Sequence, residues 1–315
     1  MLAMGIDVGG TNIRFGVFDN GNLVYTTRAQ ANLSQHCQAA SSDTSALEVV
    51  RILLAEIVNI IEKYPNIQAV GIGFPGFIHP DSKKIIQSPN LPGLSYFDLR
   101  GELMKILDLP VIIENDANAA AYGEYCLLGK PEAGLIYFGL GTGVGGGLIH
   151  ASKPFAGFHG CAMEVGHIIV EPNGRLCGCG NQGCMEQYAS ASGVSLSYTT
   201  QNSTKQKLTA EQIAELAKSG DTDAQAAYNK AGEALATALA HVLKVVDVPN
   251  IVIGGGMSLA WDLMQNAFNA RLEADLIPVL RGKVKVNISK SSDQAGMLGA
   301  AILSACALNG AILTL

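Results

Sequence analysis

Two stretches of this 315-residue chain share one pattern, and the repetition constrains the fold more than any other feature. The sequences MGIDVGGTNIRFGVF at 4–18 and IYFGLGTGVGGGLI at 136–149 each contain an apolar β-type run, a turn of glycine and threonine, and a second apolar run. Each is predicted to form a hairpin whose tip exposes backbone N–H groups. Two such tips can bind two parts of one polyphosphate, and two similar lobes explain the repetition.

Composition and periodicity favour an α/β protein. The chain has 36 glycines and only 15% charged residues, which is typical of sheets joined by many tight turns. A helix is predicted from a capping box at Ser45 to a stop before Pro65, and strands are predicted at 69–74 and 111–114. Strands that alternate with helices favour sheets that contain parallel strands.

The formal net charge of −6 argues against a broad basic surface for nucleic acid or anionic lipid. The first residues lead directly into a strand-like segment, without the charged leader and apolar core of a signal peptide. Glycines interrupt the longest uncharged stretch, 133–149, so that a membrane-spanning helix is not expected there. We therefore expect a cytoplasmic protein that binds small molecules and neither nucleic acid nor membrane.

The glycine tips have alternative explanations. Gly141, Gly143 and Gly146 match G-x-G-x-x-G, but a dinucleotide-binding turn leads into a helix, whereas a strand-like segment follows here. The P-loop pattern G-x-x-x-x-G-K-[ST] is absent from the sequence. A tight turn alone explains either tip, but two tips that both contain threonine favour phosphate binding.

Two further features fit a nucleotide site. Asp7 lies in the strand before the first tip, where a carboxylate can hold Mg²⁺ or its water shell, or can cap the turn. Gly254 and Gly255 follow a strand-like run at 250–253. Glycines at that position permit a planar ligand to approach, but close packing between a strand and a helix explains them equally well.

A histidine and three clustered cysteines predict a metal site. His167, Cys177, Cys179 and Cys184 follow the spacing H-x9-C-x-C-x4-C, which is typical of a closed tetrahedral Zn²⁺ site. A redox Cys-x-Cys pair is the alternative, but it requires neither the histidine nor a third thiol. Four protein ligands leave no open coordination position, so the zinc is expected to be structural.

Two glutamates flank these ligands. Glu164 precedes the histidine by three residues, and Glu186 follows the last cysteine by two. Carboxylates held by a metal-bound loop suit the hydroxyl groups of a sugar. Solvated surface glutamates are the alternative explanation.

Asn115 and Asp116 lie between the apolar run 109–113 and an alanine-rich segment, 117–127, that is predicted to be a helix. Asp116 can cap this helix, which is the usual role of aspartate at such a junction. It can instead be a general base at the carboxyl end of a strand, where it would accept a proton from an attacking hydroxyl.

Several motifs together carry a family resemblance over nearly the whole chain. In chain order they are DVGGT at 7–11, GFPGF at 73–77, NLPG at 90–93, ENDANAAAYGEY at 114–125, GTGVGGG at 141–147, EVGH at 164–167, CGCGNQGCMEQYAS at 177–190 and IGGGMS at 253–258. This set resembles the ROK sugar kinases, and in particular their bacterial glucokinase branch. The combination of EVGH with the cysteine run is its most specific part.

The resemblance implies two ribonuclease-H-like lobes of the actin/hexokinase type with an interlobe cleft. Residues 1–116 and a C-terminal helix at about 298–315 would form the small lobe. Residues 117–297 would form the large lobe, which carries the zinc-bound loop. A homodimer or homotetramer is expected.

The resemblance also implies roles for individual residues. The expected phosphate ligands of ATP are Gly9, Gly10, Thr11, Gly141, Thr142 and Gly143. Gly254 and Gly255 would contact the adenosine, and Asp7 would bind Mg²⁺. The expected sugar ligands are Asn90, Asn115, Asp116, Glu164, His167 and Glu186. Asp116 would be the base toward the 6-hydroxyl, and His167 would serve the sugar with one ring nitrogen and zinc with the other.

Glucose is the expected hexose, because the motifs at 114–125 and 177–190 are most similar to the glucokinase branch. N-acetylglucosamine, N-acetylmannosamine, mannose and fructose remain alternatives, as does polyphosphate in place of ATP. The same family includes sugar-responsive transcription regulators that place a helix-turn-helix before the first tip. Only six residues precede Asp7, so we expect an enzyme rather than a regulator.

Overall fold

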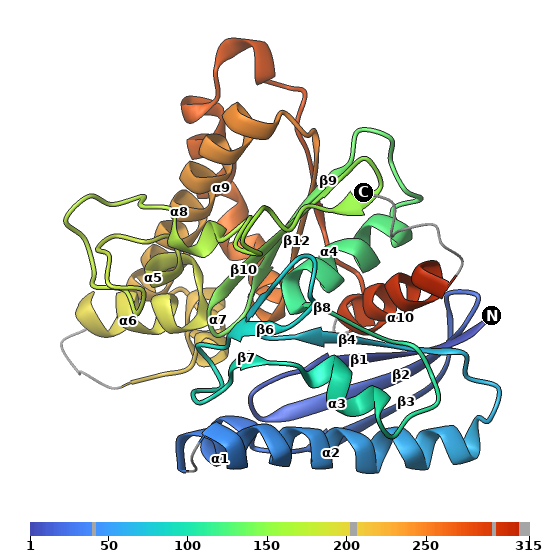
Figure 1. The fold of residues 1–315 in the computed structure, drawn as a ribbon. Coiled ribbons are helices and arrows are strands. Elements are labelled where there is room, and N and C mark those ends of the chain that lie inside the picture. The colour runs from blue at the N-terminus through green and yellow to red at the C-terminus, as the bar shows by residue number, and fades with distance from the viewer. Residues whose placement is uncertain (40–41, 202–206, 292–293, 309–315) are drawn as a thin grey trace. The chain divides into compact units, whose positions relative to one another are not determined.

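The computed structural model describes residues 1–39, 42–201, 207–291 and 294–308 (Figure 1). The chain divides into two compact units. The first comprises 1–132, 147–162 and the segment after 292, and the second comprises 133–146 and 163–292.

The first unit contains a five-stranded sheet, a small three-stranded sheet and five helices among its described residues. The elements of the five-stranded sheet are β1 (Leu2–Val8), β2 (Asn12–Asp19), β3 (Asn22–Gln30), β4 (Ala69–Phe74) and β8 (Val111–Asn115). The small sheet consists of β5 (Phe77–Ile78), β6 (Ile85–Gln87) and β7 (Ser95–Phe97). The helices are α1 (Leu33–Ala39), α2 (Ser42–Lys63), α3 (Leu99–Met104), α4 (Asp116–Leu127) and α10 (Gln294–Leu308).

Helices cover both faces of the five-stranded sheet (Figure 1). Met4 and Ile6 of β1 are fully buried in the same apolar cluster as Leu53 of α2. Gly5 and Gly71 are register partners on β1 and β4, and a Cβ on either would meet backbone atoms of α10. Because side chains alternate between the faces of a strand, α2 packs on one face and α10 on the other.

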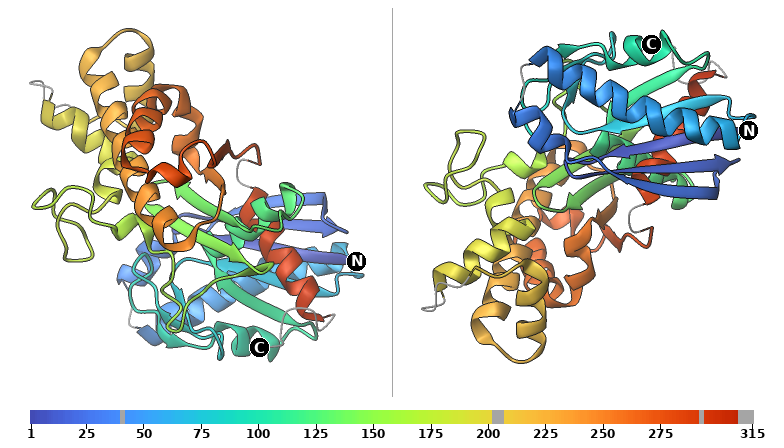
Figure 2. Two further views of the ribbon diagram at one scale, coloured as in Figure 1. Left: turned by 90° about the horizontal axis from the view of Figure 1, so that it is seen from above. Right: turned by 90° about the horizontal axis from the view of Figure 1, so that it is seen from below.

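The second unit combines strands with a group of helices. Its strands are β9 (Leu135–Leu140), the beginning of β10 (Val144–His150), β12 (Asn250–Gly254) and β13 (Lys285–Ile288). Its helices are η1 (Val165–His167), α5 (Glu186–Ala189), α6 (Ala191–Gln201), α7 (Ala210–Lys218), α8 (Thr222–Val246), η2 (Gly256–Ala260), α9 (Trp261–Asp275) and η3 (Pro278–Leu280). Helices α8 and α9 pack along each other (Figure 2).

The two large sheets have the same strand order. The first is β3-β2-β1-β4-β8, and the second, completed by β11 (Lys153–Pro154), is β11-β10-β9-β12-β13. Numbered along the chain, both read third, second, first, fourth, fifth. In both, the fourth strand pairs in parallel with the first and with the fifth. The repetition predicted from the two hairpins is confirmed.

The compact units divide the chain elsewhere than the predicted lobes of 1–116 and 117–297. Helix α4 lies in the first unit because it packs tightly on α10. A Cβ at Gly123 of α4 would meet the Ala295 carbonyl, and one at Gly299 of α10 would meet the Ala119 carbonyl. The predicted lobe boundary stays a prediction.

The structure tests two expectations about helices. Helix α2 ends at Lys63, before Pro65 as predicted, but it begins at Ser42. Ser45 is buried inside the helix, so the predicted capping box is wrong. None of the described helices combines the length and apolar character needed to cross a bilayer.

Candidate functional site

The predicted site residues fall into both units. The first unit holds Asp7, Gly9, Gly10, Thr11, Asn90, Asn115 and Asp116. The second holds Gly141, Thr142, Gly143, Glu164, His167, Cys177, Cys179, Cys184, Glu186, Gly254 and Gly255.

The first glycine tip connects β1 to β2. The Gly9 N–H donates to the Asn12 carbonyl at 2.9 Å, which closes the turn. Asp7, the second-last residue of β1, lies opposite Arg14 of β2, and Arg14 Nη1 donates to Asp7 Oδ2 at 3.0 Å. The Asp7 side chain is 21% exposed. A partly exposed carboxylate therefore lies at the base of the tip, as predicted, beside an arginine whose role the sequence did not reveal.

Ser34, which sequence analysis missed, connects this tip to the Asn90 segment. Its N–H donates to the Gly10 carbonyl at 3.0 Å, and its Oγ donates to the Asn90 carbonyl at 3.1 Å. Asn90 is exposed in the loop between β6 and β7. Two predicted site segments, far apart in the sequence, thus share one serine.

Asn115, and not Asp116, caps α4. Asn115 Oδ1 accepts a hydrogen bond from the Asn118 N–H at 3.0 Å. Its Nδ2 donates to the Gly76 carbonyl and to Asp116 Oδ1, both at 3.1 Å. Asp116 is the first helical residue, and its Oδ1 also accepts from the Ala117 N–H at 2.8 Å. The capping explanation of Asp116 is wrong, and Asn115 orients the Asp116 carboxylate.

A buried glutamate supports this junction from the strand side. Glu114 is 8% exposed, and its Oε1 accepts from the Asn115 N–H at 3.0 Å and from Asn118 Nδ2 at 3.3 Å. Its Oε2 lies 3.3 Å from Nζ of Lys83, which comes from the turn between β5 and β6. The sequence signal that could have revealed this role of Glu114 is a charged residue at the end of an apolar strand, because a buried charge requires a partner.

In the second unit, the four predicted metal ligands converge. Their ligand atoms all lie within 4.8 Å of one another. His167 Nδ1 is 3.6 Å from Cys177 Sγ, and Cys179 Sγ is 3.6 Å from Cys184 Sγ. Zinc bonds to thiolate and imidazole of about 2.0–2.3 Å place tetrahedral neighbours about 3.3–3.8 Å apart. This donor set and its spacing fit a tetrahedral Zn²⁺ site.

Residues 167–184 carry the four ligands and form the metal loop. Its shape depends on a glycine and on one arginine. Gly183 has a φ of 81°, and a Cβ there would collide with the Glu171 carbonyl. Arg175 Nη1 donates to the Gln187 carbonyl at 2.6 Å, and Nη2 donates to Ser197 Oγ at 3.0 Å. Arg175, which the sequence did not single out, therefore ties the metal loop to α5 and α6.

The second ring nitrogen of His167 points away from the thiols. Nε2 lies 3.8 Å from Glu164 Oε2. Desolvation raises the pKa of Glu164, His167 opposes the rise, and the negative charge of Glu186 adds to it. This carboxylate is still 42% exposed, so a hydroxyl ligand can reach it. The two nitrogens of His167 thus lie near different groups, Cys177 and Glu164, and their division between zinc and sugar stays a prediction.

Glu186 connects the metal loop to the second glycine tip. Its Oε2 accepts from the Val144 N–H at 2.9 Å, and a Cβ at Gly143 would meet the same oxygen. Ser192 Oγ donates to the Thr142 carbonyl at 3.0 Å. The second tip is therefore held by Glu186 and Ser192, which lie two and eight residues after the last cysteine.

The packing around Gly254 and Gly255 leaves no room for a side chain at either position. A Cβ at Gly254 would lie 2.8 Å from the ring of Tyr137. Gly255 has a φ of 82°, which disfavours other residues, and a Cβ there would meet backbone atoms of Leu140. Close packing explains both glycines, and their contact with adenosine stays a prediction.

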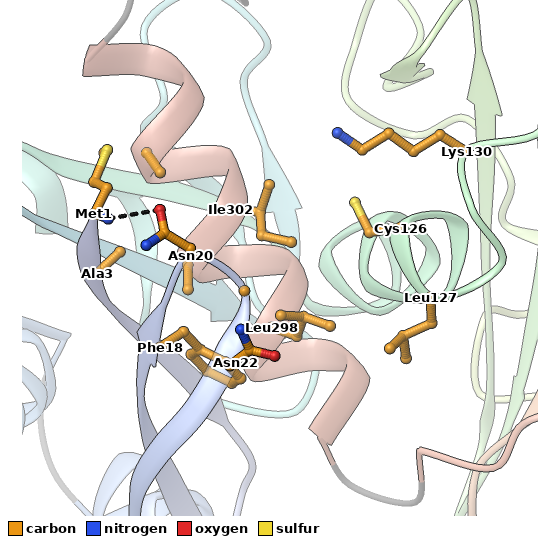
Figure 3. Close-up of a pocket in the computed structure, with 13 residues that line it drawn as sticks. Met1, Ala3, Phe18, Asn20, Asn22, Cys126, Leu127, Lys130, Leu298 and Ile302 are labelled. Carbon is orange, nitrogen blue, oxygen red and sulfur yellow. Dashed lines mark hydrogen bonds between the residues drawn. The ribbon is translucent and has the colours of Figure 1, made fainter.

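A groove of about 470 Å³ lies elsewhere in the first unit. Figure 3 shows side chains from the start of β1, from the β2–β3 hairpin, from the end of α4 and from α10 around it, including Phe18, Leu127 and Ile302. None of the predicted site residues lines it. The groove is therefore separate from the candidate site.

Comparison with known proteins identifies the family. The sequence profile of the ROK family matches residues 3–306. The chain belongs to the ROK family. It is 32% identical to a glucokinase of Streptomyces coelicolor, over 96% of this chain and 97% of that protein. It is 33% identical to an N-acetyl-D-glucosamine kinase of Shigella flexneri, over 95% of this chain and 98% of that protein.

A solved structure of this family shares the fold. A ROK family glucokinase from Streptomyces griseus, in complex with glucose and AMPPNP, superimposes with a TM-score of 0.81. It is 30% identical, over 97% of this chain and 99% of that chain. The α/β fold of the actin/hexokinase type expected from the sequence is confirmed.

Proposed function

We propose that this chain is a sugar kinase that transfers the γ-phosphate of ATP to the 6-hydroxyl of a hexose, with D-glucose as the preferred acceptor. Membership of the ROK family and the glucokinase relatives support this assignment. One observation carries it: the Asp116 carboxylate lies at the carboxyl end of β8 and is oriented by Asn115 Nδ2 and the Ala117 N–H.

Asp116 is the general base of the proposed reaction. Its carboxylate accepts the proton of the 6-hydroxyl while the bond from the sugar oxygen to the γ-phosphorus forms. The bond from that phosphorus to the bridging oxygen of ADP breaks. Asn115 holds one carboxylate oxygen in place, which preserves the geometry that proton transfer requires.

The glycine tips are the proposed phosphate ligands. In the first unit these are Gly9, Gly10 and Thr11, and in the second they are Gly141, Thr142 and Gly143. Backbone N–H groups suit phosphate oxygens in a protein with a net charge of −6. Asp7 is the proposed residue that would hold Mg²⁺ or its water shell, and the ion would supply charge neutralisation at the phosphates. Gly254 and Gly255 are the proposed adenosine contacts.

The metal loop has a structural role in this proposal. His167, Cys177, Cys179 and Cys184 would hold one Zn²⁺, which fixes the segments that carry Glu164 and Glu186. These two carboxylates and Nε2 of His167 are the proposed hexose ligands of the second unit. Asn90, Asn115 and Asp116 are those of the first. The predicted homodimer or homotetramer and the cytoplasmic location remain proposals.

ATP consumption by the purified protein tests the function. It would be followed by a coupled assay with D-glucose, N-acetylglucosamine, N-acetylmannosamine, mannose and fructose, and with polyphosphate in place of ATP. We expect the highest kcat/KM with D-glucose and ATP. A higher value with another hexose would reassign the substrate within the family. Hexose binding without any phosphate transfer would favour the regulator class.

A further inference from the structure

Ser34 contacts two functional segments in two directions. It is the second residue of α1 and is half-buried. Its backbone N–H donates to the carbonyl of Gly10 in the first tip, and its hydroxyl donates to the carbonyl of Asn90. One residue therefore spans the proposed phosphate segment and the proposed sugar segment of the first unit.

The contact with the tip is tight. A Cβ placed on Gly10 would collide with Ser34 Oγ, whereas Ser34 Cβ would be 3.7 Å away, an ordinary contact. The carbonyl of Thr11 accepts from the N–H groups of Ala31 and Asn32, both at 3.0 Å. The segment before α1 thus follows the tip closely, and a shift of the tip displaces Ser34.

The Asn90 loop has little slack to absorb such a shift. The Leu91 N–H donates to the Ser88 carbonyl at 3.1 Å, and the Leu94 N–H donates to the Leu91 carbonyl at 3.3 Å. Leu91 and Leu94 are buried in the core of the unit. Because the loop is held in place around Asn90, a shift of Ser34 would act on its hydrogen bond to the Asn90 carbonyl instead of being absorbed by the loop.

We propose that Ser34 is a positioning residue that couples the first glycine tip to the Asn90 loop, so that nucleotide bound at the tip raises the affinity for hexose. The inference rests on the proposed function. Coupling between two ligands is reciprocal, so hexose raises the nucleotide affinity by the same factor. Loss of one hydrogen bond changes an equilibrium constant by about two- to tenfold, which sets the expected size of the coupling.

Calorimetric titration measures the coupling directly. The dissociation constant for D-glucose would be determined with and without saturating Mg²⁺ and AMPPNP, in wild type, Ser34→Ala and Ser95→Ala. Ser95 is the matched control, because its exposed hydroxyl donates to the Ile86 carbonyl at 3.2 Å within the small sheet. We expect AMPPNP to lower the wild-type and Ser95→Ala constants about two- to tenfold, and to leave that of Ser34→Ala nearly unchanged.

A second variant protects the test against a folding defect. Gly10→Ala introduces a methyl group that meets the Ser34 hydroxyl, and Ser34→Ala removes that oxygen. We expect Gly10→Ala to weaken AMPPNP binding and the double variant Gly10→Ala/Ser34→Ala to recover part of it.

Specific outcomes overturn the inference. The ratio of the D-glucose dissociation constants without and with AMPPNP measures the coupling. Equal ratios in wild type and Ser34→Ala, or a ratio of one in wild type, would overturn the inference. A lack of recovery of AMPPNP binding in the double variant would do so as well. Failure of the proposed function looks different, because wild-type protein would then transfer no phosphate to any hexose.

Discussion

The β8–α4 junction of the first unit and the metal loop of the second are built on different principles. At the junction, Glu114 accepts a hydrogen bond from the Asn115 N–H, and the Asn115 side chain bonds the Asn118 N–H and the Asp116 carboxylate. Hydrogen bonds within the chain therefore orient Asp116. In the loop, one imidazole and three thiols converge. Thiols are weak hydrogen-bond donors, so we expect a metal to be needed to hold this cluster together. The junction is therefore held by its own hydrogen bonds, whereas the metal loop is expected to depend on a bound ion.

The largest effect is expected from Asp116→Asn, which tests the junction. An amide cannot accept the proton of the 6-hydroxyl, so kcat should fall about 10²–10⁴-fold. The first turn of α4 should survive, because its cap is Asn115 and not Asp116. Turnover, D-glucose affinity and melting temperature of both proteins would be compared. A stable variant with near-normal turnover on every hexose contradicts the base assignment.

Metal removal tests the loop. We expect about one zinc per chain by elemental analysis, and an approximately 10–100-fold loss of activity after chelation. Hydrogen exchange would then increase in peptides from 164–190 and stay unchanged in 111–127, because only the loop depends on the ion. If residues 164–190 of zinc-free protein kept their protection from hydrogen exchange, the metal loop would not depend on the ion and would not differ from the junction in this respect.

Zinc affinity should also depend on pH. Burial raises the pKa of the Cys184 thiol to about 12, so this thiol is protonated at neutral pH in the metal-free loop. Zinc binds the thiolate and must displace that proton, so its affinity weakens as the pH falls. Competition with a chromophoric chelator between pH 6 and 8 measures the trend. An affinity that is constant over this range contradicts it.

The smallest effect concerns the support of the junction. Lys83→Met leaves the buried Glu114 carboxylate without its cation, which should lower the free energy of unfolding by about 1–3 kcal/mol. Lys105→Met is the control, because Lys105 pairs with Glu102 at 2.7 Å but is 67% exposed. It should change stability by less than about 0.5 kcal/mol. Equal effects in urea unfolding would show that burial of the Lys83 pair is unimportant.

Local pattern predicted much of the fold. The strand expected at 69–74 is β4 residue for residue, and the one expected at 111–114 is β8 apart from one residue. Both glycine hairpins were predicted, because alternating apolar runs around a glycine turn form hairpins locally. The convergence of His167, Cys177, Cys179 and Cys184 was also predicted, because their spacing in the sequence is itself the signal, and their binding of zinc stays a prediction.

Contacts between distant segments were not predictable. Ser34 meets Asn90, Lys83 meets Glu114, and Tyr137 packs on Gly254, and no short-range pattern encodes any of these pairs. Capping by Asp116 was one of two open explanations, whereas the cap of α4 is Asn115, since helix ends are uncertain by one or two residues in any sequence-based assignment.

Identification of the product tests the central claim most directly. Uniformly ¹³C-labelled D-glucose and ATP would be incubated with wild-type protein and with Asp116→Asn, and the products followed by ¹³C and ³¹P NMR. The account predicts that wild type forms glucose 6-phosphate and ADP in equal amounts and that the variant forms the same products about 10²–10⁴-fold more slowly. No sugar phosphate, or an ester at a different hydroxyl, would contradict it.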